Sequence, residues 1–448
     1  MYTVQMQEDS GKAGRSFMYK KWLLAVLALV IICICSSCAS FAPLYERLVQ
    51  DTFSSYTQIE QYDYVAREGY SYKPATFGYS ALDSQEQQVY QQLEKAVYQI
   101  SERADSLYGS YPIQTIQTDA SFSEARFYKV AAAFEIDHPQ VFWLDGVYVC
   151  QDYAQGRSFQ MYSHLSAEAC NQAQARFHRQ LRNIVELVPQ GLSEYERELF
   201  LHDYIIDSCT YVDDGEWSRY SPYGAIVNKQ AVCEGYSEAL QLLFSCVGIE
   251  SCVLFGEYEN EAHEWNLVKI NGEWYHLDAT WNDMDQDVSE ADDHLYFNIS
   301  DAVIESNDHT IAPLYSSMTE EDVCNADEEY IALFNLFVPR CESLQQNFFY
   351  QNGAFITRLD GTLEEQPLGK MAELAEEKEA PEIYLLLDQG ISMQQADDAL
   401  FEQEPYLFFS YANAVNQMGG ENQLDDTSTF TYSMPGYNNL IIAQLQYR

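Results

Sequence analysis

The feature that most constrains the fold is the Asn271-Gly272 pair in the stretch HEWNLVKINGEWYHLDATW, residues 263–281. Alternating apolar runs on both sides of Asn-Gly predict a β-hairpin, because a two-residue turn needs positive φ at both central residues. The turn also fixes the register, with Ile270 opposite Glu273. The sequence therefore predicts an antiparallel sheet in which the face of every side chain is set.

Counting outward from this turn brings a histidine and a carboxylate onto one face of the hairpin. Trp265 then lies opposite Asp278, and His263 lies opposite Thr280. His263 and Asp278 become diagonal neighbours with Cβ atoms about 7 Å apart or less, a spacing at which imidazole and carboxylate can hydrogen-bond. His276 shares the face, and we expect it to be structural.

A cysteine stands at the start of a predicted helix in NKQAVCEGYS, residues 228–237. Apolar residues at helical spacing follow Cys233, and Gly248 ends the pattern. A helix N-terminus offers N–H donors and the positive end of the macrodipole, which favour thiolate over thiol and can bind an oxyanion. Cys233 is a candidate nucleophile, with a buried filler residue as the alternative.

Three stretches in this order resemble the transglutaminase-like superfamily of papain-type cysteine enzymes: GAIVNKQAVCEGYSEALQLLFSCVGIES, HEWNLVKINGEWYHLDATWND and HLYFNISD. The resemblance covers roughly residues 192 to 305. It implies that Cys233 is the nucleophile, His263 the general base and Asp278 the carboxylate that orients the base. It also implies an α+β fold, with the cysteine-bearing helix packed on an antiparallel sheet.

The sequence departs from the animal protein-crosslinking members, which have Gly-Gln directly before the cysteine where Ala231-Val232 stand here. This departure favours hydrolysis over crosslinking and leaves water or an amine open as the acceptor. We expect no cofactor and no metal. The acidic run at 282–294 lacks the Gly and the Glu of a calcium loop, with Val288 and His294 in their places. His202 is expected to be a hydrogen-bonded packing residue.

Charge and the N-terminal segment indicate where the protein works. Asp and Glu number 69 against 24 Lys and Arg, a net charge of -45, which excludes nucleic acid as a partner because phosphate binding needs clustered cations. Residues 1–42 contain basic residues followed by an uncharged stretch, typical of an export signal. Two outcomes stay open: a lipid-modified Cys38, or an uncleaved helix over 22–42 that anchors the chain to the outer face of the cytoplasmic membrane.

Composition shifts along the chain predict its domain organisation. We expect a signal or anchor at 1–42, a polar stalk at 43–80, an N-terminal α/β domain at 81–191, the catalytic domain at 192–320 and a C-terminal α/β domain at 321–448. Within the N-terminal domain, apolar spacing predicts a helix from Ser84 that places Ile100 and Leu107 on its stripe. A second helix is expected in SEARFYKVAAAFEI, and a further long helix is expected to begin at Ser166.

These features predict a membrane-anchored extracellular cysteine enzyme that attacks peptide or side-chain amides through a thioester. Its expected location outside the cytoplasmic membrane suggests cell-wall peptides or surface proteins as substrates. The alternative is a surface binding or assembly module that keeps the fold without catalysis. Activation of Cys233 is the property that separates the two hypotheses.

Overall fold

The computed structural model describes residues 56–64, 67–153, 156–259, 261–283, 291–311, 338–377, 382–388, 390–419, 422–425, 431–432, 437 and 439–447. The predicted signal or anchor, Cys38 and residues 284–290 of the acidic run lie outside these residues. Within the described ranges, no helix combines the length and the apolar character needed to cross a bilayer.

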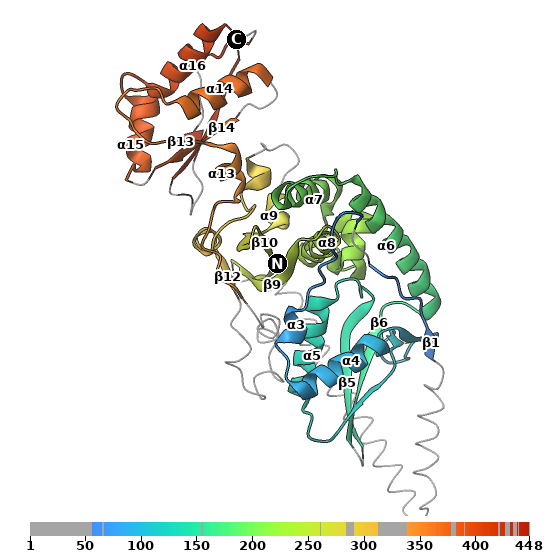
Figure 1. Ribbon diagram of the computed structural model, residues 1–448. Helices are drawn as coiled ribbons and strands as arrows, with labels where there is room; N and C mark the ends of the chain where they lie inside the picture. The colour runs from blue at the N-terminus through green and yellow to red at the C-terminus, as the bar shows by residue number, and fades with distance from the viewer. Residues whose placement is uncertain are drawn as a thin grey trace, which may run out of the picture.

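The N-terminal part is a small antiparallel sheet flanked by helices (Figure 1). Strand β6 lies between β3 and β4, and β5 also pairs with β6. The strands are β3 (Tyr111–Pro112), β4 (Ile116–Thr118), β5 (Leu144–Tyr153) and β6 (Gly156–Ser163). The helices are α3 (Phe77–Ser80), α4 (Ser84–Ala96), α5 (Glu124–Asp137) and α6 (Ala167–Leu187). Helix α6 starts directly after Ser166, as predicted, and the Ser166 hydroxyl caps it.

Two expectations for this part are wrong. Helix α4 ends at Ala96, and Ile100 lies in β2 (Gln99–Ser101), which pairs with β1 (Tyr56–Gln58). Leu107 is 51% exposed. The segment expected to be a stalk therefore supplies a strand to this domain, and its Ile59 is buried. Strands β1 and β2 form because they pair with each other, although they are far apart in the sequence. The spacing of apolar residues within one segment does not reveal such a partner.

The central part holds a four-stranded antiparallel sheet of order β11-β10-β9-β12. Its strands are β9 (Glu250–Tyr258), β10 (Glu261–Ile270), β11 (Glu273–Leu277) and β12 (His309–Ile311). Helix α8 (Cys233–Cys246) packs against β9 and β10, with α7 (Glu194–Ser208) beside it (Figure 1). The short elements are β7 (Thr210–Tyr211), η1 (Trp217–Tyr220), η2 (Gly224–Asn228), β8 (Gln230–Ala231), α9 (Ala279–Asn282), η3 (Asp292–His294) and α10 (Asp301–Glu305).

The hairpin between β10 and β11 forms as the sequence predicts. Asn271 and Gly272 have φ of 52° and 91°, the positive values that the tight turn needs. Ile270 pairs with Glu273, and the predicted register is confirmed.

The hairpin ladder ends earlier than predicted, at the pair Asn266 and Leu277. Asp278 leaves the strand and becomes the N-cap of α9, so Thr280 does not lie opposite His263. An aspartate at this position satisfies the N–H groups of the next helix turn, and this favours the helix over two more strand residues.

The C-terminal part forms a separate lobe with its own sheet, of order β13-β14-β16-β15 (Figure 1). The strands are β13 (Ala354–Ile356), β14 (Glu382–Leu387), β15 (Thr431–Tyr432) and β16 (Leu440–Gln444). The helical elements are α13 (Phe348–Asn352), α14 (Glu365–Glu377), α15 (Met393–Asp397), η5 (Asp398–Glu402) and α16 (Leu407–Met418).

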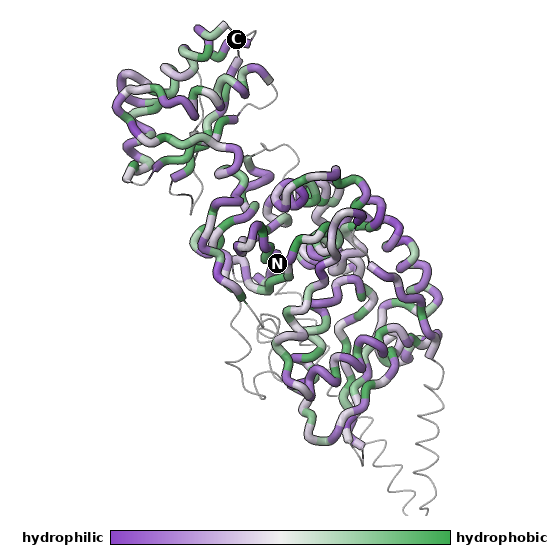
Figure 2. The backbone as a smooth tube through the Cα atoms, viewed as in Figure 1, coloured by the Kyte–Doolittle hydropathy of each residue, from purple (hydrophilic) through white to green (hydrophobic). Residues whose placement is uncertain are grey.

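Two main hydrophobic cores hold the described residues together. One core runs through the N-terminal and central parts, from Ile59 to Ile304, and reaches a few C-terminal residues. The other lies within the C-terminal lobe, between its sheet and α14 and α16. Hydrophobic and hydrophilic stretches alternate along the chain in every part (Figure 2), as expected for elements with one buried face. The fold is α+β.

Candidate active site

The centre of the site is the carboxylate of Asp278, which is 1% exposed at the start of α9. Its Oδ2 lies 2.6 Å from Nε2 of His263, a residue of β10. Its Oδ1 accepts the N–H groups of Thr280 and Trp281, both at 3.1 Å. The predicted pairing of His263 with Asp278 is present in the structure.

Hydrogen bonds keep this carboxylate ionised although it is buried. Burial alone raises the pKa of a carboxyl, but here the charge and hydrogen bond of His263, with a hydrogen bond from His309, hold the pKa of Asp278 below its usual range. An ionised Asp278 accepts the Nε2 proton of His263. The other ring nitrogen, Nδ1, is then the one that can act as a base.

His309 is a site residue that sequence reasoning missed. It opens the three-residue strand β12, and its Nε2 lies 3.1 Å from Oδ2 of Asp278. It follows Asp278 by 31 residues, and no periodic pattern or turn links the two in the sequence. Only the pairing of β12 with β9, which puts His309 opposite Tyr258, brings it to the carboxylate.

Cys233 is the first residue of α8, as predicted, and it is half-buried. The backbone of Glu264 lies close enough to the Cys233 thiol to favour its ionised form and so to lower its pKa. Glu264 follows His263 directly in β10, so the structure brings the cysteine to the strand position next to the histidine. The helix start and the strand of the base therefore meet.

The expected thiolate is not favoured at rest. Burial raises the pKa of the Cys233 thiol well above its ordinary value, and the carboxyls of Glu234 and Glu264 raise it further. The positive end of the α8 dipole is therefore outweighed by burial and nearby acids. In the resting structure Cys233 is a thiol, so attack on a carbonyl requires a base to remove its proton.

Glu264 carries a proton of its own. Its carboxyl, 2% exposed, contacts the hydroxyl of Ser237, which also donates to the carbonyl oxygen of Glu234 at 3.1 Å. A hydroxyl has one proton, so both contacts are hydrogen bonds only when Glu264 is protonated. Burial raises the pKa of Glu264 well above its ordinary value, in agreement. Because Glu264 is neutral in this arrangement, its charge does not raise the pKa of the Cys233 thiol, and burial and Glu234 are the largest causes that remain.

His276 has a structural role, as predicted. It lies opposite Leu267 in the ladder. Its Nδ1 accepts the indole N–H of Trp265 at 3.0 Å, and its Nε2 donates to Oδ1 of Asp301 at 3.0 Å. Trp265 is 1% exposed and belongs to the core beneath the site.

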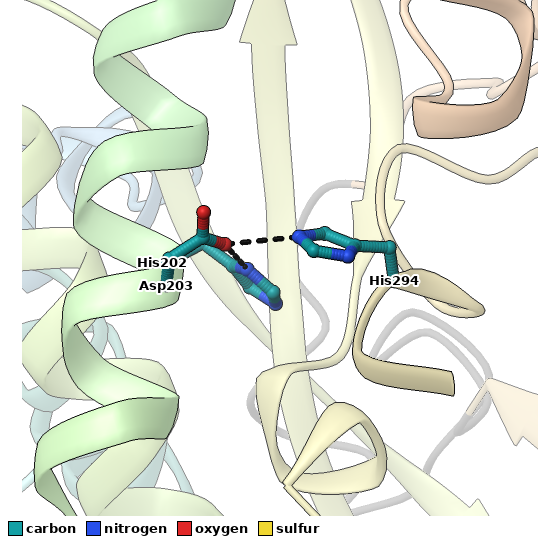
Figure 3. Close-up of side chains that lie close together, drawn as sticks. All are labelled: His202, Asp203 and His294. Atoms are coloured by element: carbon teal, nitrogen blue, oxygen red, sulfur yellow. Dashed lines mark hydrogen bonds and ion pairs between the residues drawn. The ribbon is translucent and has the colours of Figure 1, made fainter. Parts of the chain in front are cut away.

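A second His–Asp–His group lies between α7 and η3 (Figure 3). Oδ1 of Asp203 lies 2.9 Å from Nδ1 of His202 and 3.0 Å from Nε2 of His294. The Tyr296 N–H donates to Oδ1 of Asn282, so the Asn282 amide nitrogen must donate to Nε2 of His202, 2.9 Å away. The His202 proton therefore sits on Nδ1 and faces Asp203. His202 is the buried, hydrogen-bonded packing residue that the sequence predicted.

The described residues contain three groups whose possible metal-ligand atoms lie within 4.8 Å of one another: His202, Asp203 and His294; His263, Asp278 and His309; His276, Asp301 and Cys341. In the first and third groups, Asn282 and Trp265 respectively place the ring proton on the histidine nitrogen that faces the aspartate. A protonated nitrogen has no lone pair for a metal. We therefore assign no metal to these two groups.

Comparison with known proteins identifies this part of the chain. Residues 184–279, which include Cys233, His263 and Asp278, match the model of the transglutaminase-like superfamily, and the resemblance predicted from the sequence is confirmed. His309 lies beyond the matched segment. None of the curated proteins matches the sequence.

Several solved structures are similar to the chain. One is described as a candidate cysteine protease from Cytophaga hutchinsonii, with 14% identity, a TM-score of 0.21, and coverage of 30% of this chain and 61% of that one. A structure described as a TGase has 11% identity, a TM-score of 0.25, and coverage of 45% and 62%. A candidate protease from Parabacteroides distasonis has 8% identity, a TM-score of 0.23, and coverage of 67% and 61%. The chain spans about three fifths of the length of each.

Proposed function

We propose that this chain, whose central segment is transglutaminase-like, is an exported, membrane-anchored cysteine enzyme that hydrolyses amides of peptides or proteins through a thioester. One observation carries the proposal. An ionised, buried Asp278 holds His263 at 2.6 Å, while Cys233 stands at the start of α8, which packs on β10, close to the backbone of Glu264, the next strand residue. Nucleophile, base and orienting carboxylate are the three parts that acyl transfer requires.

The reaction begins with a neutral thiol and a neutral imidazole. Nδ1 of His263 takes the thiol proton as the Cys233 sulfur bonds to the amide carbon, and Asp278 stabilises the imidazolium that forms. N–H groups in the first turn of α8 lack partners within the helix and can donate to the carbonyl oxygen, which gains negative charge. His263 then gives its proton to the amine, the C–N bond breaks and a thioester remains.

Water completes the cycle in our proposal. His263 removes a proton from water as its oxygen attacks the thioester carbon, and the sulfur leaves and regains a proton from the imidazolium. We prefer water over an amine because Ala231-Val232 replace the Gly-Gln of the crosslinking relatives. The predicted export signal points to cell-wall peptides or surface proteins as the substrate class.

Trapping the acyl-enzyme tests this proposal. Purified protein is mixed with a cell-wall extract or a surface proteome, quenched in acid, and the peptide containing residue 233 is analysed by mass spectrometry. The proposal predicts an acyl adduct on Cys233 in the wild type and none in Cys233→Ala. If the wild type carries no adduct from either source, the hydrolase proposal is contradicted.

The raised pKa of the Cys233 thiol is the observation that favours the alternative, a binding module without catalysis. The activated ester p-nitrophenyl acetate separates the two functions. An enzyme releases a burst of p-nitrophenolate that depends on both Cys233 and His263. A binding module reacts no faster than its His263→Ala variant.

A further inference from the structure

The carboxylate of Asp278 is within hydrogen-bond distance of two imidazole rings, those of His263 and His309. Oδ1 is occupied by two backbone N–H groups, and Oδ2 faces Nε2 of both His263 and His309, at 2.6 and 3.1 Å. An ionised carboxylate has about four lone-pair positions, and all four are used here. His309 is therefore part of the arrangement that holds the base.

Both nitrogens of the His309 ring face hydrogen-bond acceptors. Nε2 faces the carboxylate of Asp278, and Nδ1 lies 2.8 Å from the backbone carbonyl oxygen of Asn307. A carbonyl oxygen can only accept, and an ionised carboxylate can only accept. Both bonds form together only when the ring carries two protons and a positive charge.

Burial disfavours a charged ring, so a charged His309 requires a negative group beside it. The His309 side chain is fully buried, and four aromatic rings stand around it: Tyr258 at 5.1 Å, Trp265 at 5.4 Å, Tyr296 at 5.5 Å and Trp281 at 6.4 Å between centroids. Asp278 supplies the balancing negative charge inside the protein.

We propose that His309 is a buried imidazolium that acts as a positioning residue for His263 through the carboxylate they share. The inference rests on the proposed function in that His263 is taken as the base. A cation on the far side of Asp278 offsets part of the carboxylate charge, so the imidazolium form of His263 gains less stabilisation. This favours the neutral form of His263, the form needed to accept a proton from a neutral Cys233.

The other titratable groups around His309 do not supply a competing positive charge. Facing it are His263 from β10, Asp278 and His276 from the β11 side, Tyr258 from β9, and Tyr296, with Asp308 preceding it in the chain. The hydrogen bond from Trp265 fixes His276 as neutral, with its single proton on Nε2. A positive charge on a ring beside Asp278 is therefore carried by His309 or by His263.

The experiment measures ring protonation directly. Nitrogen-15 NMR of histidine-labelled protein reports whether each ring nitrogen carries a proton. We expect both nitrogens of His309 to be protonated in the wild type at neutral pH. We also compare His309→Gln, whose amide can still donate to Asp278 but carries no charge. Since the two rings lie 5.5 Å apart, the midpoint of His263 titration should rise by about one pH unit in this variant.

His276→Gln is the matched control, because it also removes a buried histidine that is hydrogen-bonded to an aspartate in the same sheet. A role limited to packing predicts lower thermal stability in both variants and an unchanged His263 titration in both. That result overturns the proposal, as does a His309 ring with one proton in the wild type. If His309→Gln does not fold, the number of protons on the His309 ring in the wild-type spectrum still tests the proposal.

Two further outcomes are distinguished by these spectra together with the acylation experiment on Cys233. Zinc that binds to the wild type and removes the proton signals from Nε2 of both rings would make this group a metal site and overturn the proposal. If acylation of Cys233 is absent but His309 carries two protons, the hydrolase function fails while the charge on His309 stands. If Cys233 is not acylated and His309 carries only one proton, both the hydrolase function and the charge on His309 are contradicted.

Discussion

Replacing Asp278 by asparagine makes the sharpest perturbation of the site. The backbone N–H groups of Thr280 and Trp281 require an oxygen at the Oδ1 position, so the amide nitrogen of the new residue takes the place of Oδ2. That nitrogen donates toward Nε2 of His263, which must then accept. The His263 proton moves to Nδ1, and the base is lost without loss of bulk.

The size of the effect follows from the role of the base. General-base catalysis contributes about 10²- to 10⁴-fold, so we expect acylation of Cys233 to slow by roughly 10³-fold, or about 4 kcal/mol in activation free energy. The cap of α9 should be kept, because asparagine is as good an N-cap as aspartate, but the variant should unfold at a lower temperature than the wild type at neutral pH, because it lacks the buried negative charge. The stability that the lowered pKa of Asp278 provides is present above pH 3.8 and is lost as pH falls, so the two proteins should converge in acid.

The assay is the p-nitrophenolate burst from p-nitrophenyl acetate, measured beside thermal unfolding of the wild type and the asparagine variant. A folded Asp278→Asn protein with a burst rate within tenfold of the wild type would refute the assignment of His263 as a base controlled by this carboxylate. Asp301→Asn is the control, because Asp301 bonds His276 and not His263.

Three further changes test the electrostatics and packing around the site. Glu264→Gln should gain melting temperature relative to the wild type as pH rises above 4.5, because burial raises the pKa of Glu264 and its ionisation destabilises the fold; equal pH profiles would contradict this. Asn282→Ala removes the donor to Nε2 of His202 and should cost about 1–3 kcal/mol in urea unfolding, whereas a loss below about 0.5 kcal/mol would count against that bond. In Gly256→Ala the new Cβ would lie 2.3 Å from the carbonyl oxygen of Thr310, and we expect a loss of about 1–3 kcal/mol; an unchanged midpoint would show that β12 can shift freely.

The parts of the site that could be predicted are those set by local chain geometry. The Asn271-Gly272 turn fixes its own register, so it placed His263 near Asp278 without any knowledge of the rest of the fold. Apolar periodicity after Cys233 located the start of α8. Both predictions use only neighbours along the chain, where the helix and strand periods apply.

The parts that could not be predicted depend on contacts between distant segments. His309 reaches Asp278 because a three-residue strand pairs with β9, and so short a strand has no periodicity to detect. The raised pKa of Cys233 reflects burial, which one sequence does not report. The sequence predicts a stalk at 43–80 because the partner of β1, the strand β2, lies elsewhere in the sequence. Tertiary pairing outweighed local pattern in each case.

The most direct test of the central claim is to find where an acyl group from p-nitrophenyl acetate attaches. After a brief reaction and an acid quench, peptide mass spectrometry locates the acetyl group, and hydroxylamine distinguishes a thioester from a stable amide. The account predicts one hydroxylamine-sensitive acetyl on Cys233 that forms far more slowly in His263→Ala. Acetylation spread over the other cysteines, or an equal rate in that variant, would contradict it.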